Sequence, residues 1–142
     1  AHAHPMYGKT FSTLGKTLDP ISQDSCAFYE RTALFADYDG VANGPDEGIN
    51  IAKALGDKDF VILQNHGILT TGTMVDTTIW YFLNMEDACK SQLLAEAVGK
   101  PIVIPHETAC ATRDYVANDL SAYVSFQPTV DVLWEEEPDL LD

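Results

Sequence analysis

The chain has 142 residues, of which 46% are hydrophobic and 21% are charged. These values are typical of one globular domain and exclude a disordered chain. Its 22 Asp and Glu residues outnumber 8 Lys and Arg, and the formal charge of −14 argues against nucleic acid and anionic membranes as partners. No apolar run approaches the ~20 residues of a membrane span. Three cysteines without a CxxC pair favour a reducing, cytoplasmic location.

The amino-terminal part of the chain predicts short strands that alternate with helices. Residues 6–14 predict a helical turn after the end of a strand, and residues 18–29 predict a second short helix that follows a proline turn. Residues 32–35 predict a strand that ends before the turn signal Asp39-Gly40. The cluster Asn43-Gly44-Pro45-Asp46-Glu47 predicts the start of a helix that ends at Gly56.

The next part of the chain predicts two buried strands and a long helix. Residues 60–63 form an apolar run suited to a strand covered on both faces, and residues 68–71 continue it after Gly67. Thr73 and Asp76 resemble a capping box at the start of a helix that runs to Val98. The apolar residues available for its buried stripe are Ile79, Phe82, Leu83, Ala88, Leu93 and Ala97.

The carboxy-terminal part predicts an extended segment over residues 101–105, a helix over residues 107–116 and a tail. The tail, residues 127–142, contains Pro128 and the run Glu135-Glu136-Glu137, and it predicts a loose or surface-wrapping acidic arm. The alternation of strands and helices indicates a layered α/β domain. The chain begins at Ala1 inside a motif and without a Met, so we expect residues 1–142 to be part of a larger domain.

Two histidines near the amino terminus have a spacing that suits a metal site. His2 and His4 are two residues apart, so on an extended strand both rings project from the same face, with α-carbons roughly 6.5 Å apart. Two imidazoles in this arrangement can bind one ion. The same pair also fits two polar residues on an exposed strand, or the remnant of a tag.

A third histidine interrupts the apolar region of the predicted strands. His66 lies in Leu63-Gln64-Asn65-His66-Gly67-Ile68, where two polar residues break what would otherwise be a core strand. Gly67 permits a close backbone approach or an unusual dihedral angle at this point. A histidine here fits either a hydrogen-bonded core residue or a ligand at a functional site.

Three segments, in order and at suitable separation, resemble the class II aldolase/adducin family. They are His2-Ala3-His4-Pro5, Asn65-His66-Gly67-Ile68-Leu69 with the later Gly72, and the long helix with Met85-Glu86. The segment Pro20-Ile21-Ser22-Gln23-Asp24 is similar to a fungal subgroup of this family that often has no assigned activity. The resemblance covers residues 1 to about 100. It implies a three-layer α/β/α sandwich and a ring-like homotetramer with the active site at the subunit interface.

The resemblance also implies a cofactor and an activity. In aldolase members the HxH pair and the HG histidine are zinc ligands, which by position are His2, His4 and His66. Zinc held by three side chains keeps a coordination position for substrate and acts as a Lewis acid. We therefore expect a zinc-dependent lyase that cleaves a phosphorylated ketose, such as fuculose-1-phosphate, into dihydroxyacetone phosphate and an aldehyde through an enediolate.

The chain departs from the family pattern at the catalytic base. The family's base glutamate and its phosphate-binding loops lie upstream of the HxH pair, before residue 1, so no catalytic base is assigned here. The family's downstream tyrosine has no counterpart, because counting from the pair leads to Gln23. Gln23 and Asp24 are candidates for substrate contact or, equally, for a helix cap. The acidic surface also opposes long-range attraction of a phosphorylated sugar.

Two other functions are compatible with the same residues. One is a non-catalytic oligomerisation domain similar to the adducin head, and the other is a metal-dependent sugar-phosphate epimerase or decarboxylase of the same family. The remaining candidate residues have structural interpretations. His106 fits a surface helix start, Tyr7 fits pocket lining or packing, and Trp80, Tyr81 and Phe82 fit the core or a subunit interface. Glu135 to Glu137 fit a solvated face, and Cys26 and Cys89 fit small apolar packing.

Overall fold

The computed structural model describes residues 1–37 and 45–141 of the chain. The predicted turn at Asp39-Gly40 and the Asn43-Gly44 part of the helix-start cluster lie outside these residues. The described helices include none that is long and apolar enough to cross a lipid bilayer.

Four short strands form one mixed sheet in the order β1-β4-β3-β2. The strands are β1 (His2–Ala3), β2 (Thr32–Phe35), β3 (Phe60–Leu63) and β4 (Gly67–Thr70). Strands β2 and β3 are parallel, whereas β4 is antiparallel to both β3 and β1. The bounds predicted for β2 and β3 are confirmed. The second strand predicted after Gly67 is confirmed as β4, which reverses on β3 as a hairpin, with Leu63 paired to Gly67.

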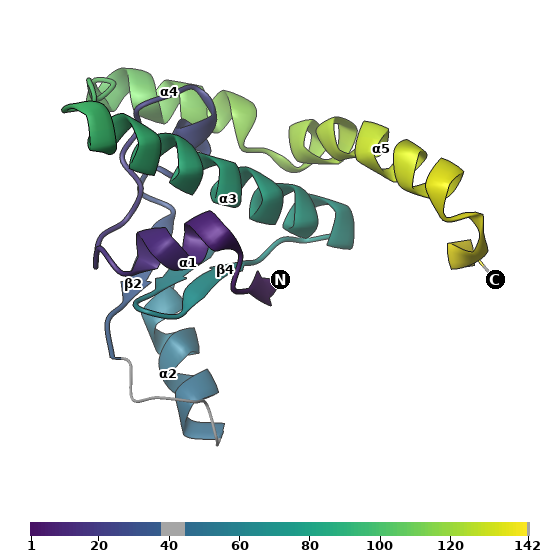
Figure 1. The fold of residues 1–142 in the computed structure, drawn as a ribbon, viewed down its shortest axis with the longest axis horizontal. Coiled ribbons are helices and arrows are strands. Elements are labelled where there is room, and N and C mark those ends of the chain that lie inside the picture. Colours follow the sequence, from purple (N-terminus) through teal and green to yellow (C-terminus); the bar gives the residue numbers. More distant parts are fainter. Residues whose placement is uncertain (38–44, 142) are drawn as a thin grey trace.

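Helices cover both faces of this sheet, as Figure 1 shows. On one face, Phe60, Ile62 and Ile68 pack in a core with residues of α1 (Met6–Ser12), the 3-10 helix η1 (Asp24–Phe28) and α3 (Val75–Val98). On the other face, Val61 and Leu63 pack against α2 (Pro45–Leu55). Alternate residues of β3 therefore point to opposite layers. The three-layer α/β/α prediction is confirmed.

The long helix α3 begins and packs differently from the prediction. The Met74 N–H donates to the hydroxyl of Thr77 at 3.4 Å, whereas Thr73 donates to the Asp119 carboxylate at 2.7 Å, so the predicted Thr73–Asp76 box does not form. The predicted buried stripe is confirmed in part. Ala88 is buried and Phe82 and Leu93 pack partly buried against the core, whereas Leu83 is 48% exposed and Ala97 is also exposed. The buried residues of α3 are Thr77, Tyr81, Met85, Ala88, Cys89 and Gln92.

Two further helices follow α3. Helix α4 (His106–Val116) confirms the predicted helix at this position, and α5 (Asp119–Glu136) is followed by the 3-10 helix η2 (Pro138–Leu141). Helix α5 begins beside the start of α3, with Ala122 in the core, and its carboxy-terminal part extends away from the rest of the molecule (Figure 1). It corrects the prediction of a loose arm, because the helix continues through Gln127 and Pro128. A largely exposed helix tolerates an internal proline because water can bind the carbonyl that loses its partner.

Candidate metal centre

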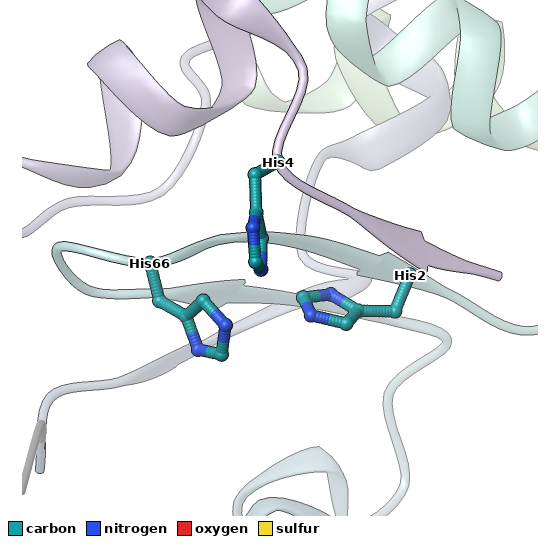
Figure 2. Close-up of side chains that lie close together, drawn as sticks. All are labelled: His2, His4 and His66. Atoms are coloured by element: carbon teal, nitrogen blue, oxygen red, sulfur yellow. The ribbon is translucent and has the colours of Figure 1, made fainter. Parts of the chain in front are cut away.

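The sheet edge formed by β1 and β4 brings the three predicted histidines together. His2 lies in β1 opposite Leu69, and His66 ends the turn that joins β3 to β4. The ring centroids are 5.1 Å apart for His2 and His4, 5.0 Å for His2 and His66, and 4.5 Å for His4 and His66. The three rings converge on one point (Figure 2), with one nitrogen from each within 4.8 Å of the others.

The hairpin turn sets the position of His66. Asn65 has a φ of 58°, a left-handed conformation that asparagine tolerates better than most residues. The His66 N–H then donates to the Leu63 carbonyl at 3.0 Å, and the Asn65 N–H donates to the Ser12 carbonyl at 3.4 Å. The polar interruption seen in the sequence is therefore a tight turn that carries a histidine out of the core strand.

Gly67 permits β1 to lie against the hairpin. A Cβ atom at this position would be 2.6 Å from the Ala3 carbonyl oxygen and 3.1 Å from Cδ2 of His4. The first distance is far below van der Waals contact, and the atom it meets is backbone, which cannot rotate away. The close approach predicted for Gly67 is confirmed, and it is what allows His4 and His66 to share one side of the sheet edge.

Glu86 of α3 anchors the segment that follows His4. Its carboxylate accepts the N–H of Tyr7 at 2.9 Å and the N–H of Gly8 at 2.5 Å, both in the first turn of α1. Free amide groups and the positive end of the helix dipole make this turn a favourable place for a carboxylate. Glu86 lies in one of the segments that resemble the family, but nothing in the sequence indicates that its carboxylate binds the N–H of Gly8, 78 positions away.

The sequence allowed Tyr7 to line a pocket or to pack in the core, and the structure shows it packing. It is partly buried against the core, and Nζ of Lys90 lies 5.3 Å from the centre of its ring. Its backbone contributes to the anchor through Glu86.

The contacts of His2 define which of its nitrogens is available to a metal. Its Nδ1 lies 2.9 Å from the Ile68 carbonyl oxygen. A carbonyl oxygen only accepts hydrogen bonds, so Nδ1 carries the proton and Nε2 keeps its lone pair. This arrangement is the usual support of a metal-binding histidine, because it fixes both the tautomer and the ring orientation.

The surroundings of His66 favour the neutral imidazole that a metal requires. Burial lowers the pKa of His66, and the nearby rings of His2 and His4 lower it further, while Glu47 acts in the opposite direction. The donor set also fits zinc. Tetrahedral zinc with Zn–N bonds of about 2.0–2.1 Å separates its nitrogens by roughly 3.4 Å, so small ring rotations would suffice.

The other predicted contact residues lie elsewhere. Gln23 is the N-cap residue of η1, and neither it nor Asp24 makes a side-chain capping bond there. Gln23 lines a groove together with Thr112 and Tyr115 of α4, and none of the three histidines lines that groove. His106 begins α4, as predicted, and it also lies beside Glu30 and Cys110. Cys26 and Cys89 are fully buried, which confirms their predicted packing role.

Comparisons with known proteins agree with this architecture. The sequence pattern described as "Class II Aldolase and Adducin N-terminal domain" matches residues 1–93. The decarboxylase NovR of Streptomyces niveus is 37% identical over 139 residues, which cover 98% of this chain and 52% of that protein. The chain belongs to the class II aldolase/adducin family.

Two other relatives extend the comparison. The meiotically up-regulated gene 14 protein of Schizosaccharomyces pombe is 40% identical over 130 residues, which cover 89% of this chain and 51% of that protein. The structure of L-fuculose 1-phosphate aldolase from Glaciozyma antarctica PI12 matches with a TM-score of 0.87 and 38% identity, over 97% of this chain and 52% of that one. The chain thus spans about half the length of these family members.

Proposed function

We propose that this chain provides the metal centre of a zinc-dependent carbon–carbon lyase that cleaves a phosphorylated ketose, such as fuculose-1-phosphate, into dihydroxyacetone phosphate and an aldehyde. The observation that carries the proposal is the convergence of His2, His4 and His66, whose ligand nitrogens lie within 4.8 Å of one another. The similarity to an L-fuculose 1-phosphate aldolase supports the choice of substrate class.

Each part of the centre has a defined role in this proposal. A zinc ion bound here would supply Lewis acidity toward the carbonyl and hydroxyl oxygens of the sugar. The three neutral imidazoles hold the ion, and the Ile68 carbonyl orients His2. His2 and His4 are exposed, so substrate can reach the open side of the centre. In the family that the chain resembles, the base and the phosphate-binding loops lie upstream of the HxH pair, so the proposed activity needs this centre together with such a segment.

Metal analysis tests the centre separately from the activity. Purified protein dialysed against zinc-free buffer should retain about one equivalent of tightly bound zinc, and His66→Ala should lose it, because a structural or catalytic zinc site needs at least three protein ligands. Gln64→Ala is the matched control, since it alters the same turn without removing a ligand and should keep the metal. Less than a tenth of an equivalent in the unaltered protein, or full retention in His66→Ala, would exclude the metal centre.

A second activity within the family has an observation in its favour. The similarity to the decarboxylase NovR covers 98% of this chain, so we also consider decarboxylation at the same centre. Product analysis, on protein that includes any segment upstream of residue 1, separates the two. Release of an aldehyde and dihydroxyacetone phosphate from fuculose-, rhamnulose- or ribulose-phosphate supports the lyase, release of CO₂ from a carboxylated substrate supports the decarboxylase, and a changed ketose supports an epimerase.

The third candidate, an adducin-like oligomerisation domain, requires no metal. It predicts a zinc-free protein whose three histidines can be replaced without effect on assembly. For the enzyme we propose a cytoplasmic homotetramer, and light scattering of the purified protein would measure its mass directly.

A further inference from the structure

A second group of metal-binding side chains lies on α4, apart from the three histidines. His106 and Cys110 are four residues apart on this helix, so their side chains lie on the same face. Glu30 reaches them from the segment between η1 and β2. One ligand atom from each of the three residues lies within 4.8 Å of the others.

The separations within this cluster are close to those that a metal requires. Nδ1 of His106 lies 3.7 Å from Oε1 of Glu30 and 3.8 Å from Sγ of Cys110, and Sγ lies 3.8 Å from Oε2 of Glu30. Tetrahedral zinc with bonds of about 2.0–2.3 Å separates its ligand atoms by roughly 3.3–3.8 Å. The His106 pairs are therefore within a few tenths of an ångström of a metal-bound geometry, whereas the Cys110 thiol makes its close approach to the other oxygen of Glu30, so a small rotation of the carboxylate or the thiol is needed to bring one oxygen to both.

The neighbours of the cluster orient Glu30. Arg113 donates to Oε2 of Glu30 at 3.4 Å and is itself paired with Asp114 at 2.9 Å. The guanidinium thus holds one carboxylate oxygen and leaves the other toward His106. Glu30 has a φ of 60°, an unfavourable backbone conformation for a residue other than glycine, and this conformation fixes the direction from which its side chain arrives.

The contacts of His106 and of the Cys110 thiol show what a metal would replace in this cluster. The hydroxyl of Tyr29 lies 3.2 Å from Nδ1 of His106, so a metal on this nitrogen would replace that contact. The contacts of the Cys110 thiol, at 3.8 to 3.9 Å, are long and weak, so little is lost when the thiol binds a metal. The formal charge of −14 also raises the local concentration of cations.

We infer that Glu30, His106 and Cys110 form a second site for a divalent transition metal, with Zn²⁺ as the best-matched ion. A thiolate and an imidazole select zinc and related metals over magnesium and calcium, which prefer oxygen ligands. Binding releases the thiol proton to solvent, and a water molecule completes the coordination. His106 and Glu30 are 62% and 49% exposed at their side chains, so metal exchanges readily with solvent. The site does not depend on the function proposed above.

Cobalt spectroscopy distinguishes this site from the histidine centre. Cobalt(II) bound by a thiolate gives a near-ultraviolet charge-transfer band, whereas cobalt bound by three histidines gives none. Cys110 is the only thiol of the three that is not fully buried, so the band reports on this cluster. Titration of the metal-free protein with Co²⁺ should produce the band, and added Zn²⁺ should abolish it by displacing the cobalt.

Four variants assign the band to residues. Cys110→Ser should abolish it, and Glu30→Gln should weaken Co²⁺ binding at least about tenfold, the usual cost of disturbing a metal site. His66→Ala should keep the band because it belongs to the other cluster. Tyr29→Phe is the matched control, since it removes a neighbour of His106 but no ligand, and it should bind Co²⁺ at least as tightly as the unaltered protein.

A second measurement keeps the result independent of the optical signal. Zn²⁺ should slow alkylation of Cys110 by iodoacetamide at least about tenfold, because only the free thiolate reacts. Peptide mass spectrometry reads this rate, and circular dichroism verifies that each variant is folded. Absence of the charge-transfer band in the folded, unaltered protein, its persistence in Cys110→Ser, or alkylation unaffected by Zn²⁺ would each overturn the site.

Discussion

The histidine cluster at the edge of the sheet and the Glu30–His106–Cys110 cluster on α4 both bring three ligands within 4.8 Å of one another, but they are assembled differently. The histidines come from a strand and from a hairpin turn, and the contact between His2 and Ile68 joins residues 66 positions apart. In the second cluster, one turn of a single helix supplies two of the three ligands.

This difference determines what each site requires from the rest of the molecule. The histidine cluster depends on the close approach of β1 to β4 and on the carboxylate of Glu86, both of which are tertiary contacts. In the second cluster the helix itself holds His106 and Cys110 on one face, and only Glu30 depends on a tertiary contact. Substitution of residues that support the histidine cluster should therefore lower the free energy of unfolding, whereas substitution of residues in the second cluster should not.

The largest effect is expected from Gly67→Ala. The added methyl would lie 2.6 Å from the Ala3 carbonyl oxygen, so β1 must move away from the hairpin. We expect the free energy of unfolding to fall by about 3 kcal/mol, at the upper end for an overpacked core. Displacement of β1 also separates His4 from His66, so zinc affinity should fall with stability. Urea denaturation and a zinc titration measure the two effects.

Gly48→Ala is the control for this substitution. Gly48 lies in α2, and a Cβ atom there would meet no heavy atom within 4 Å. Alanine in a helix interior is favoured over glycine, so this variant should be more stable by roughly 0.5–1 kcal/mol. If both variants changed stability in the same direction, the close approach at Gly67 would not be what the histidine cluster requires.

The next effect is expected from Glu86→Ala. The substitution leaves the N–H groups of Tyr7 and Gly8 without their carboxylate partner. A hydrogen bond to a charged group contributes about 1.5–3 kcal/mol net, and the two N–H groups share one carboxylate, so we expect a loss of about 2 kcal/mol. Since α1 follows His4 directly, zinc should also bind more weakly. Asp87→Ala, an exposed acid one residue along α3, should change neither quantity, and equal effects of the two would remove Glu86 from its positioning role.

The sequence was sufficient for the parts of the fold that depend on local pattern. The apolar run at residues 60–63 predicted β3 with the correct bounds, because a strand buried on both faces must be continuously apolar, and the polar residues that bound residues 32–35 predicted β2. The buried side of α3 was predicted only in part, for a physical reason. It contains Thr77 and Gln92, whose side chains are satisfied by hydrogen bonds, so a search for apolar residues alone does not find them.

The two clusters also differ in how much of each is visible in the sequence. The positions of His2, His4 and His66 were predicted from a family resemblance, because the spacing of an HxH pair and a distant histidine does not itself show that they meet. The four-residue spacing of His106 and Cys110 is also visible in the sequence, where His106 was interpreted only as the start of a surface helix. Their partner, Glu30, lies 80 positions from Cys110, and only the tertiary structure brings it there.

A smaller effect, with a defined pH dependence, is expected from Glu96→Gln, which removes an ion pair between the segment after α1 and helix α3. Lys16 pairs with Glu96, and this bond, helped by one from Gln92, holds the pKa of Glu96 below its ordinary value of 4.5. A lowered carboxyl pKa contributes stability that is present above the ordinary value and is lost as the pH falls through the lowered one. Glu96→Gln should therefore cost about 0.5–1 kcal/mol at neutral pH.

The difference between Glu96→Gln and the unaltered protein should shrink as the solution is acidified below the ordinary carboxyl pKa. Urea denaturation at neutral pH and at about pH 3 measures this change. Glu107→Gln, at an exposed position that forms no ion pair with the described residues, is the control and should show no such trend. A cost that stayed constant with pH would mean that packing, and not the charge of Glu96, fastens this segment.

The smallest effect on folding is expected from Cys110→Ser in the absence of metal. The thiol is partly exposed and its contacts are 3.8 to 3.9 Å long, so the free energy of unfolding should change by less than about 0.5 kcal/mol. Zinc should then separate the two proteins, because a ligand at ten times its Kd stabilises the folded state by about 1.4 kcal/mol. The histidine cluster is present in both proteins, so its contribution cancels in the difference. A cost above 1 kcal/mol without metal would show that Cys110 supports the fold, and the contrast between the two clusters would then be wrong.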